Sequence, residues 1–207
     1  MIEVKHLTKK YGSHLALDDL SFTIEKGQIY GFLGPNGAGK STTMNIMTGY
    51  IGADSGEILI NGCDILEEPE KAKKSIGYLP EIPPLYLDMT VREYLSFVSE
   101  LKDIPKKDRE SEVDEVCSLV KLNEVSHRLI RNLSKGYRQR TGLAAAVLGF
   151  PDIIILDEPT VGLDPKQIIE IRQLIRTLAK DHTVILSSHI LAEVQEICDY
   201  VLIISKG

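Results

Sequence analysis

Eight consecutive residues of the chain have the types and spacing that bind phosphate groups. Residues 34–41 read Gly-Pro-Asn-Gly-Ala-Gly-Lys-Ser, which matches the complete pattern G-x-x-x-x-G-K-S. The glycines let the backbone curl so that successive N–H groups face one phosphate. Lys40 can then reach the outer phosphates, and the hydroxyl of Ser41 can ligate Mg²⁺. The pattern predicts a site for a nucleoside triphosphate, with contacts from Gly34, Pro35, Asn36, Gly37, Ala38, Gly39, Lys40, Ser41 and Thr42.

The segments on either side of this loop give it the setting that the pattern requires. Residues 28–33, Gln-Ile-Tyr-Gly-Phe-Leu, are apolar and β-prone, and residues 42–47, Thr-Thr-Met-Asn-Ile-Met, can continue as a helix. Strand, glycine-rich loop and helix in this order are typical of a phosphate loop. The helix directs the positive end of its dipole at the bound charge, which favours an anion there.

A pair of carboxylates follows a second apolar strand. Residues 153–158 read Ile-Ile-Ile-Leu-Asp-Glu. Buried carboxylates are costly unless a cation pairs with them, and Mg²⁺–nucleotide at the carboxyl end of a parallel strand supplies that cation. Adjacent strand residues point in opposite directions. We therefore expect Asp157 to hold the metal, directly or through water, and Glu158 to orient and deprotonate the attacking water. Capping of the next helix is the alternative, but Asp164 already fills that role.

Two further segments carry weaker signals. His189 follows an apolar strand at 183–186 and the pair Ser187-Ser188. A lone histidine is more often structural, but this one lies at a strand end beside the same predicted sheet edge. Residues 132–140 open a helix for which Ser134 is a natural N-cap, and Gly136 permits close backbone approach in its first turn. These features predict a capped helix start, with a phosphate contact as the functional alternative.

The remaining pattern predicts an α/β fold with an inserted helical lobe. Residues 2–6, 15–24 and 57–60 have β-like character, and Asn61-Gly62 is a hairpin signal, so a small antiparallel layer is expected near the N-terminus. Nearly continuous apolar runs predict the strands of a buried parallel sheet. These runs are residues 75–79, 153–156, 183–186 and 200–204.

Helix signals fill the middle of the chain. Thr90 and Glu93 form a T-x-x-E capping box before an apolar stripe at helical spacing. Asp164 followed by Pro165 predicts the start of another helix. Residues 84–150 look helical throughout, with strand patterns on both sides. We therefore divide the chain into an α/β core at 1–83 and 151–207 and a helical subdomain at 84–150.

Composition and charge indicate a globular protein and disfavour several other classes. The chain has 207 residues, 43% of them hydrophobic and 26% charged, as in ordinary globular proteins. The net charge of −6 disfavours a dedicated nucleic-acid binder. No apolar run approaches the roughly 20 residues that span a bilayer, and the N-terminus lacks the apolar stretch of a secretory signal. Cys63, Cys117 and Cys198 are predicted to be reduced, buried core thiols. Any membrane-spanning part would belong to another chain.

Taken together, the motifs resemble the ATP-binding subunits of ABC transporters over essentially the whole chain. Residues 133–140, Leu-Ser-Lys-Gly-Tyr-Arg-Gln-Arg, are similar to the family signature L-S-G-G-Q-x-Q-R. Residues 157–160, Asp-Glu-Pro-Thr, resemble its metal and general-base motif, and residues 161–164, Val-Gly-Leu-Asp, the loop that communicates across a dimer. His189 matches the switch histidine, and Tyr11 the aromatic residue that stacks on adenine.

The resemblance implies an activity and partners. It implies that two such domains meet head to tail around two Mg-ATP. Each nucleotide would lie between the phosphate loop of one domain and the signature of the other, here Ser134, Lys135, Gly136 and Tyr137. Closure would exclude water, and hydrolysis would reopen the pair, with Glu158 as the base and His189 steadying the γ-phosphate. That cycle would drive a separate membrane-spanning subunit, which would hold the chain at the inner face of the cell membrane. The coupling contacts would lie near Glu81 and residues 82–95.

Three features depart from the family pattern. Glu81 replaces a glutamine that ligates the metal, so an acid here ligates Mg²⁺ more strongly but adds negative charge near a triphosphate. Lys135 and Tyr137 replace a glycine and a glutamine of the signature, and Lys135 either supplies a cation toward phosphate or is solvated. The chain also stops just after the predicted strand at 200–204, earlier than family members usually do, which implies a missing C-terminal segment.

The signature variants look most like the branch that powers exporters of drugs, lipids or polysaccharides, including gliding-associated systems. An import subunit is one alternative. A soluble, non-transport ATPase of the family, such as an assembly factor, is the other. Ribosomal members carry two such domains and DNA-repair members carry long coiled coils, and neither fits 207 residues without a heptad run.

Overall fold

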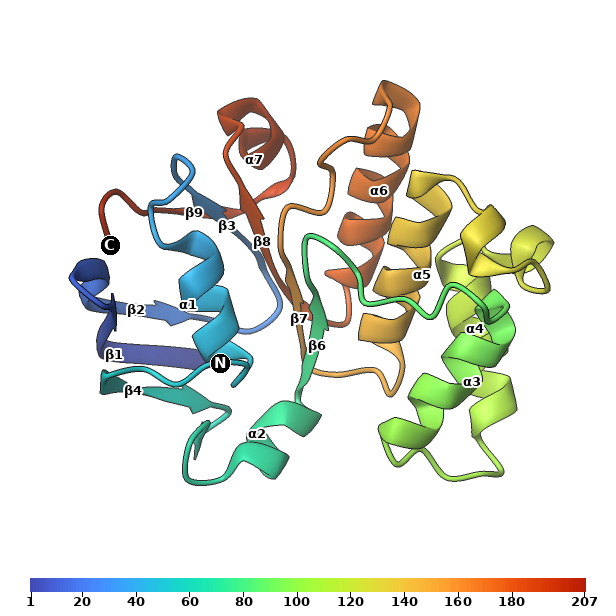
Figure 1. The fold of residues 1–207 in the computed structure, drawn as a ribbon, viewed down its shortest axis with the longest axis horizontal. Coiled ribbons are helices and arrows are strands. Elements are labelled where there is room, and N and C mark those ends of the chain that lie inside the picture. The colour runs from blue at the N-terminus through green and yellow to red at the C-terminus, as the bar shows by residue number, and fades with distance from the viewer.

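The computed structural model describes residues 1–207, and the chain forms two β-sheets with helices between and beside them (Figure 1). The antiparallel sheet has the strand order β2-β1-β4-β5, and the parallel sheet has the order β6-β7-β8-β3-β9. The first sheet consists of β1 (Ile2–Tyr11), β2 (His14–Ile24), β4 (Ser55–Ile60) and β5 (Cys63–Asp64). The second consists of β3 (Ile29–Leu33), β6 (Ile76–Leu79), β7 (Ile153–Leu156), β8 (Thr183–Ser188) and β9 (Tyr200–Ile203). The predicted α/β fold class is confirmed.

The helices occupy two regions. One helix, α1 (Lys40–Met47), lies between the two sheets, and α5, α6 and the smaller helices beyond them lie on the other side of the parallel sheet (Figure 1). The remaining helices are α2 (Pro69–Lys74), α3 (Val91–Leu101), α4 (Arg109–Leu119), α5 (Lys135–Val147), α6 (Pro165–Leu178) and α7 (Leu191–Ile197), with short 3₁₀ turns at Asn123–Val125 and Ile130–Asn132. Helices α3, α4 and α5 all fall within residues 84–150, the range for which the sequence predicts a helical subdomain.

Alternation along the parallel strands divides the core into two clusters. In β7, Ile153 and Ile155 pack on the side of α1 and the antiparallel sheet, while Ile154 and Leu156 pack on the side of α5 and α6. Successive side chains of a strand point to opposite faces, so a run that is apolar at every position needs a cover on each face. Because β7, β8 and β3 pair in parallel, their carboxyl ends lie on the same side of this covered sheet.

The helix caps and the hairpin turn that the sequence predicts are present in the structure. Thr90 and Glu93 form both hydrogen bonds of the capping box at the start of α3, and Asp164 accepts a hydrogen bond from Gln167 N at the start of α6. Asn61 and Gly62 both have positive φ in the turn between β4 and β5, as a tight hairpin requires. Each of these features depends on neighbours in the chain, which is why the sequence predicts them.

Two expectations about burial are wrong in part. The strand β9 pairs only with β3 and lies at the edge of the sheet, so its side chains are not covered on both faces; Ile203 is 74% exposed. All three cysteines are free, but only Cys117 is buried, because Cys63 and Cys198 lie at the margins of the two core clusters. Burial still raises the pKa of the Cys198 thiol to about 12, and it raises that of Cys117.

Candidate active site

The phosphate loop joins the end of β3 to the start of α1, as the sequence predicts. Gly37 and Gly39 have φ values of 82° and 106°, in the region that residues with side chains avoid. Gly34 is needed for space: a Cβ there would lie 2.3 Å from the carbonyl oxygen of Ile204, after β9. The glycines therefore allow the curled backbone and also let the loop approach its neighbours closely.

Lys40 is the cation of this loop. Its side chain is 6% exposed, and Nζ donates hydrogen bonds to the carbonyl oxygens of Gly34 at 2.8 Å and Pro35 at 3.3 Å. Nζ also lies 3.8 Å from Oε1 of Glu158. Carbonyl oxygens satisfy the ammonium group without neutralising it, so its charge is available to an anion at the loop.

The two carboxylates after β7 have different environments. The backbone N–H of Glu158 donates to Oγ of Ser187 at 2.8 Å, and that hydroxyl donates to Oδ1 of Asp157 at 2.6 Å. Glu158 has a φ of 47°, an uncommon conformation for a residue with a side chain, which costs free energy. The turn aims its carboxylate toward the phosphate loop, while Asp157 is held toward the end of β8. The paired acids can therefore perform separate tasks.

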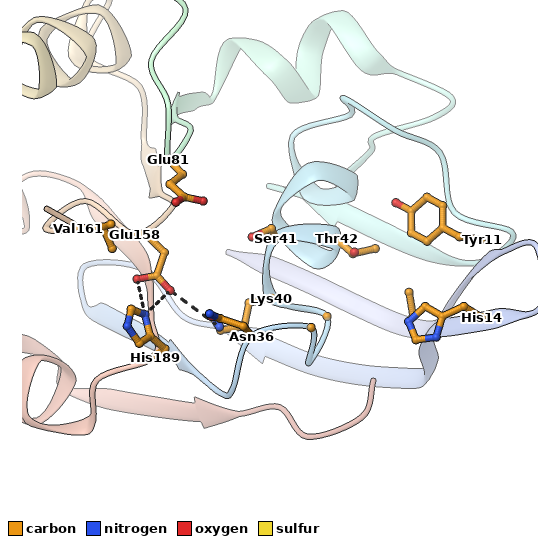
Figure 2. Close-up of a pocket in the computed structure, with 13 residues that line it drawn as sticks. Tyr11, His14, Asn36, Lys40, Ser41, Thr42, Glu81, Glu158, Val161 and His189 are labelled. Atoms are coloured by element: carbon orange, nitrogen blue, oxygen red, sulfur yellow. Dashed lines mark hydrogen bonds and ion pairs between the residues drawn. The ribbon is translucent and has the colours of Figure 1, made fainter.

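His189 lies opposite Glu158. Its Nδ1 atom is 3.1 Å from both carboxylate oxygens of Glu158, and the ring remains 41% exposed. Figure 2 shows Glu158 between the ring of His189 and the amine of Lys40, with Glu81 above it. Glu158 can accept a proton, and His189 and Lys40 can each donate hydrogen bonds to phosphate. These three side chains meet at the carboxyl ends of three neighbouring parallel strands, where ligands of such sheets bind.

These residues line a cleft of about 470 Å³. Tyr11 and His14, at the turn between β1 and β2, form its far end, across Ser41 and Thr42 from Glu158 (Figure 2). Tyr11 is 50% exposed, so one face of its ring is open to a ligand. The cleft brings together ten residues that the sequence analysis proposes, namely Tyr11, Asn36, Gly37, Gly39, Lys40, Ser41, Thr42, Glu81, Glu158 and His189.

Asp157 lies just beyond this cleft. With Ser41 and Glu81 it lines a neighbouring groove of about 670 Å³ between the core and the helical lobe. The structure contains no cluster of three or more His, Cys, Asp or Glu side chains placed to hold a metal. Mg²⁺ at nucleotide sites uses one or two carboxylates together with phosphates and water. The hydroxyl of Ser41 with the carboxylates of Asp157 and Glu81 fits such a partial donor set.

The same groove contains three titratable side chains with altered acidity. Burial, with a contribution from the charge of Asp157, raises the pKa of Tyr78, and burial raises that of Tyr94. Burial lowers the pKa of Lys102 to about 8, against a smaller opposite effect of Glu112. These three side chains are thus poorly solvated where they line the groove.

The segment 134–137 does not enter the cleft of its own chain. Ser134 caps α5 by accepting a hydrogen bond from Tyr137 N, as predicted. Gly136 is packed against Gln167, whose side chain would lie 2.6 Å from an added Cβ, so the close approach involves a side chain rather than backbone. The amine of Lys135 lies over Gly162, and Lys135 lines a separate pocket with Glu81 and Arg138.

Several residues of the site have no clear signal in the sequence. His14 and Ala16 line the cleft, and Ser187 links Asp157 to the backbone of Glu158. His14 lies opposite Tyr11 in the β1–β2 hairpin register, so a strand boundary placed at residue 14 would have indicated it. Ser187 depends on the pairing of β7 with β8, which a single sequence does not show.

Comparison with known proteins identifies the class. The family "ABC transporter" matches residues 17–161. The bacitracin transport ATP-binding protein BcrA of Bacillus licheniformis is 42% identical over all of this chain and 67% of its own length. The lantibiotic transport ATP-binding protein SrtF of Streptococcus pyogenes is 35% identical over all of this chain and 88% of its own.

Solved structures agree with this assignment. A dimeric ATP-binding cassette in a post-hydrolysis state, bound to ADP and phosphate, has a TM-score of 0.89 and 25% identity, covering all of this chain and 95% of its own. The subunit cbiO1 of Clostridium perfringens, part of the complex cbiONQ, has a TM-score of 0.89 and 28% identity over all of this chain and 85% of its own. The chain belongs to the ABC transporter family. It is an ATP-binding subunit that hydrolyses ATP, and none of its helices has the length and apolar character needed to cross a bilayer.

Proposed function

We propose that this chain hydrolyses Mg-ATP in the cleft between the phosphate loop, Glu158 and His189, and that hydrolysis powers export through a separate membrane subunit. One observation carries the catalytic part: Glu158 lies 3.8 Å from Lys40 and 3.1 Å from His189 at the carboxyl edge of the sheet. Relatives named for bacitracin transport and lantibiotic transport support the export part.

Each residue of the cleft has a proposed role. Tyr11 stacks on the adenine, and the backbone of residues 34–42 with Lys40 binds the phosphates. Glu158 accepts a proton from the water that attacks the γ-phosphate, and His189 donates a hydrogen bond to that phosphate. Because His189 and Lys40 both contact the carboxylate, binding of the nucleotide exchanges these contacts for phosphate oxygens and leaves Glu158 available as a base.

Mg²⁺ is the proposed cofactor. Ser41, Asp157 and Glu81 would hold it, and when bound it would neutralise charge on the outer phosphates. The residues of the chain bind and orient the nucleotide around that ion. Ser187 contributes by holding the carboxylate of Asp157 and the backbone of Glu158 together.

A second copy or a related domain completes the site. Ser134, Lys135, Gly136 and Tyr137 lie outside their own cleft, at the N-terminus of α5, where free N–H groups favour an anion. We propose that they contact the nucleotide of the partner domain. The dimeric cassette that this chain resembles supports this arrangement.

The groove between the core and residues 84–150 is the proposed docking surface for the membrane subunit. Its lining includes Ile82, Pro83, Pro84 and Tyr94, and both Ile82 and the nearby Tyr86 are largely exposed. Residues 84–150 would act as a subdomain that moves with the partner. The chain would then sit on the inner face of the membrane without crossing it.

Two measurements test these proposals. Phosphate release with Mg-ATP is expected to be slower in Glu158→Gln while nucleotide binding remains, and an unchanged rate would remove Glu158 as the base. Photo-crosslinkers placed at Ile82 and Tyr86 are expected to trap a membrane protein in cells. Crosslinks only from sites outside the groove would contradict the docking surface.

A further inference from the structure

A carboxylate on α7 connects the two segments that carry Glu158 and His189. Oε2 of Glu193 accepts hydrogen bonds from the hydroxyl of Thr160 at 2.8 Å and from the hydroxyl of Ser188 at 3.1 Å. Thr160 is the second residue after Glu158, and Ser188 immediately precedes His189. We propose that Glu193 is a positioning residue for ATP hydrolysis, which fixes the base and the histidine relative to each other. This inference rests on the proposed roles of Glu158 and His189.

The contacts of Glu193 form a network that is largely shielded from solvent. The Glu193 side chain is 12% exposed, and both hydroxyl groups that donate to it belong to buried residues. Nη2 of Arg172, on α6, lies 3.8 Å from Oε1 of Glu193 and partly compensates its charge. A largely buried carboxylate with two hydroxyl donors and a cation nearby is strongly held, so its position constrains the groups that donate to it.

Ser188 is held from two sides. Its hydroxyl donates to Glu193 and accepts a hydrogen bond from the backbone N–H of Ile190 at 3.1 Å. His189 is the single residue between these two positions, at the passage from β8 to α7. Anchoring of Ser188 therefore determines the direction in which the His189 ring leaves the backbone.

Thr160 anchors the turn after Glu158. In this turn the N–H of Val161 donates to the carbonyl oxygen of Glu158 at 3.2 Å, and the N–H of Leu163 donates to that of Thr160 at 3.2 Å. Glu158 itself has the strained φ of 47°. A strained conformation persists only where surrounding contacts hold it. The hydrogen bond from Thr160 to Glu193 ties this turn to the segment that carries the histidine.

Glu193 acts at a distance from the nucleotide. It does not line the cleft, whose phosphate-binding residues lie on the separate β3–α1 segment. Loss of the hydroxyl acceptor would release the two catalytic segments while leaving the phosphate loop intact. Since a misplacement of about 1 Å can cost roughly 10²-fold in rate, the expected result is a lower kcat with little change in KM.

The test compares three substitutions on α7 in the full chain. Glu193→Ala removes the acceptor, and we expect kcat for Mg-ATP to fall by roughly 10- to 100-fold with KM within about 3-fold. Glu193→Gln keeps an oxygen that can accept both hydroxyl groups, and we expect it to retain kcat within about 3-fold. Glu196→Ala is the matched control, because Glu196 also pairs with Arg172 but contacts neither hydroxyl.

A second pair of variants tests the hydroxyl contact itself. Thr160→Ser keeps the donor and is expected to keep the rate. Thr160→Val keeps the shape and is expected to lower kcat, by no more than Glu193→Ala does, because the hydrogen bond from Ser188 to Glu193 remains. The double variant Thr160→Val with Glu193→Ala is expected to be no slower than Glu193→Ala alone, since Glu193→Ala already removes the hydrogen bond from Thr160. Additive losses would contradict the contact.

The outcomes separate this inference from the proposed function. Parental kcat in Glu193→Ala, equal losses in Glu193→Ala and Glu193→Gln, or a loss that appears as weaker ATP binding or as unfolding at the assay temperature would each overturn the positioning role. If Glu158→Gln hydrolyses ATP at the parental rate, the proposed function fails whatever the Glu193 variants do. If Glu158→Gln is slow and Glu193→Ala is not, only the positioning role fails.

Discussion

Nδ1 of His189 lies 3.1 Å from both carboxylate oxygens of Glu158, across 31 residues of sequence. Lys40 approaches the same carboxylate at 3.8 Å from the phosphate loop. The carboxylate is therefore held between the imidazole of His189 and the amine of Lys40. Both of these groups also attract phosphate oxygens, which supports the proposal that the outer phosphate of a bound nucleotide and its attacking water meet at Glu158.

The first prediction concerns the base. Glu158→Gln keeps the size and hydrogen-bonding capacity of the side chain but cannot accept the proton of the water, so kcat for ATP hydrolysis should fall by roughly 10²- to 10⁴-fold. The affinity for ATP, measured by calorimetry in the same buffer, should change by less than about 3-fold. Glu67→Gln, an exposed residue outside the cleft, is the matched control. Equal hydrolysis by both variants would show that another group activates the water.

The second prediction concerns the phosphate loop. Lys40→Met keeps an apolar stem of similar length but removes the ammonium group that lies over the loop carbonyls. Loss of a hydrogen bond to a charged partner costs about 1.5–3 kcal/mol, so the Kd for ATP should rise by roughly 10- to 150-fold. Lys74→Met, on the exposed side of α2, should bind as the parent does. Undiminished affinity in Lys40→Met would place the nucleotide elsewhere.

These two sites belong to the part of the structure that can be predicted from the sequence alone. The phosphate loop and the pair Asp157-Glu158 are local patterns whose residues are neighbours in the chain, and the capping box at Thr90 and Glu93 is local in the same way. Such patterns predict both the element and its chemistry. The interpretation of an α/β core with a helical lobe follows from them and from apolar periodicity.

The remaining features depend on which strands become neighbours. The contact of Glu158 with Ser187 requires β7 to pair with β8, and the contact of Thr160 with Glu193 requires α7 to pack beside that edge. The predicted burial of the strand at 200–204 is wrong for the same reason. Its apolar composition resembles that of β7, but its position at the sheet edge leaves Ile203 exposed.

The third prediction concerns the adenine. Tyr11 is half-exposed at the end of the cleft opposite Glu158, where its ring can stack on a base. Stacking of a base on an aromatic side chain is worth about 1–3 kcal/mol, so Tyr11→Ala should raise the Kd for ATP by roughly 5- to 150-fold. Tyr11→Phe keeps the ring and should bind within about 2-fold of the parent.

A matched measurement separates stacking from a general disturbance of the cleft. Inorganic triphosphate lacks a base, so Tyr11→Ala should bind it as the parent does. Equal weakening for ATP and for triphosphate would show that Tyr11 supports the loop and does not contact the base. Tyr50→Ala, an exposed tyrosine outside this cleft, serves as the control variant.

The fourth prediction concerns Mg²⁺. Glu81 presents a carboxylate at the boundary of the cleft and the groove, close to the region shared with Ser41 and Asp157. Mg²⁺ prefers anionic oxygen ligands, so Glu81→Gln should raise the half-saturating Mg²⁺ concentration for ATP hydrolysis by roughly 3- to 10-fold. Titrating Mg²⁺ at fixed ATP measures this value. A lower half-saturating concentration would show that the charge of Glu81 repels the triphosphate more than it attracts the metal.

The last prediction concerns pH and the lobe. Lys102, at the end of α3, donates hydrogen bonds to the carbonyl oxygens of Ala146 and Leu148 at 3.0 and 2.6 Å, and burial lowers its pKa from 10.5 to about 8. Between these two values the unfolded chain holds a proton that the folded chain has released. The contribution of Lys102 therefore makes the free energy of unfolding increase as pH rises through this window.

Lys102→Met removes the titrating group and keeps an apolar stem. Between about pH 7.5 and pH 10, the free energy of unfolding of the parent should increase by about 1–3 kcal/mol relative to that of this variant. Urea unfolding at several pH values measures the shift, and Lys106→Met, in the exposed segment after α3, should show none. A difference that stays constant with pH would mean that the amine is solvated and that the lobe packs less tightly around Lys102 than its two hydrogen bonds imply.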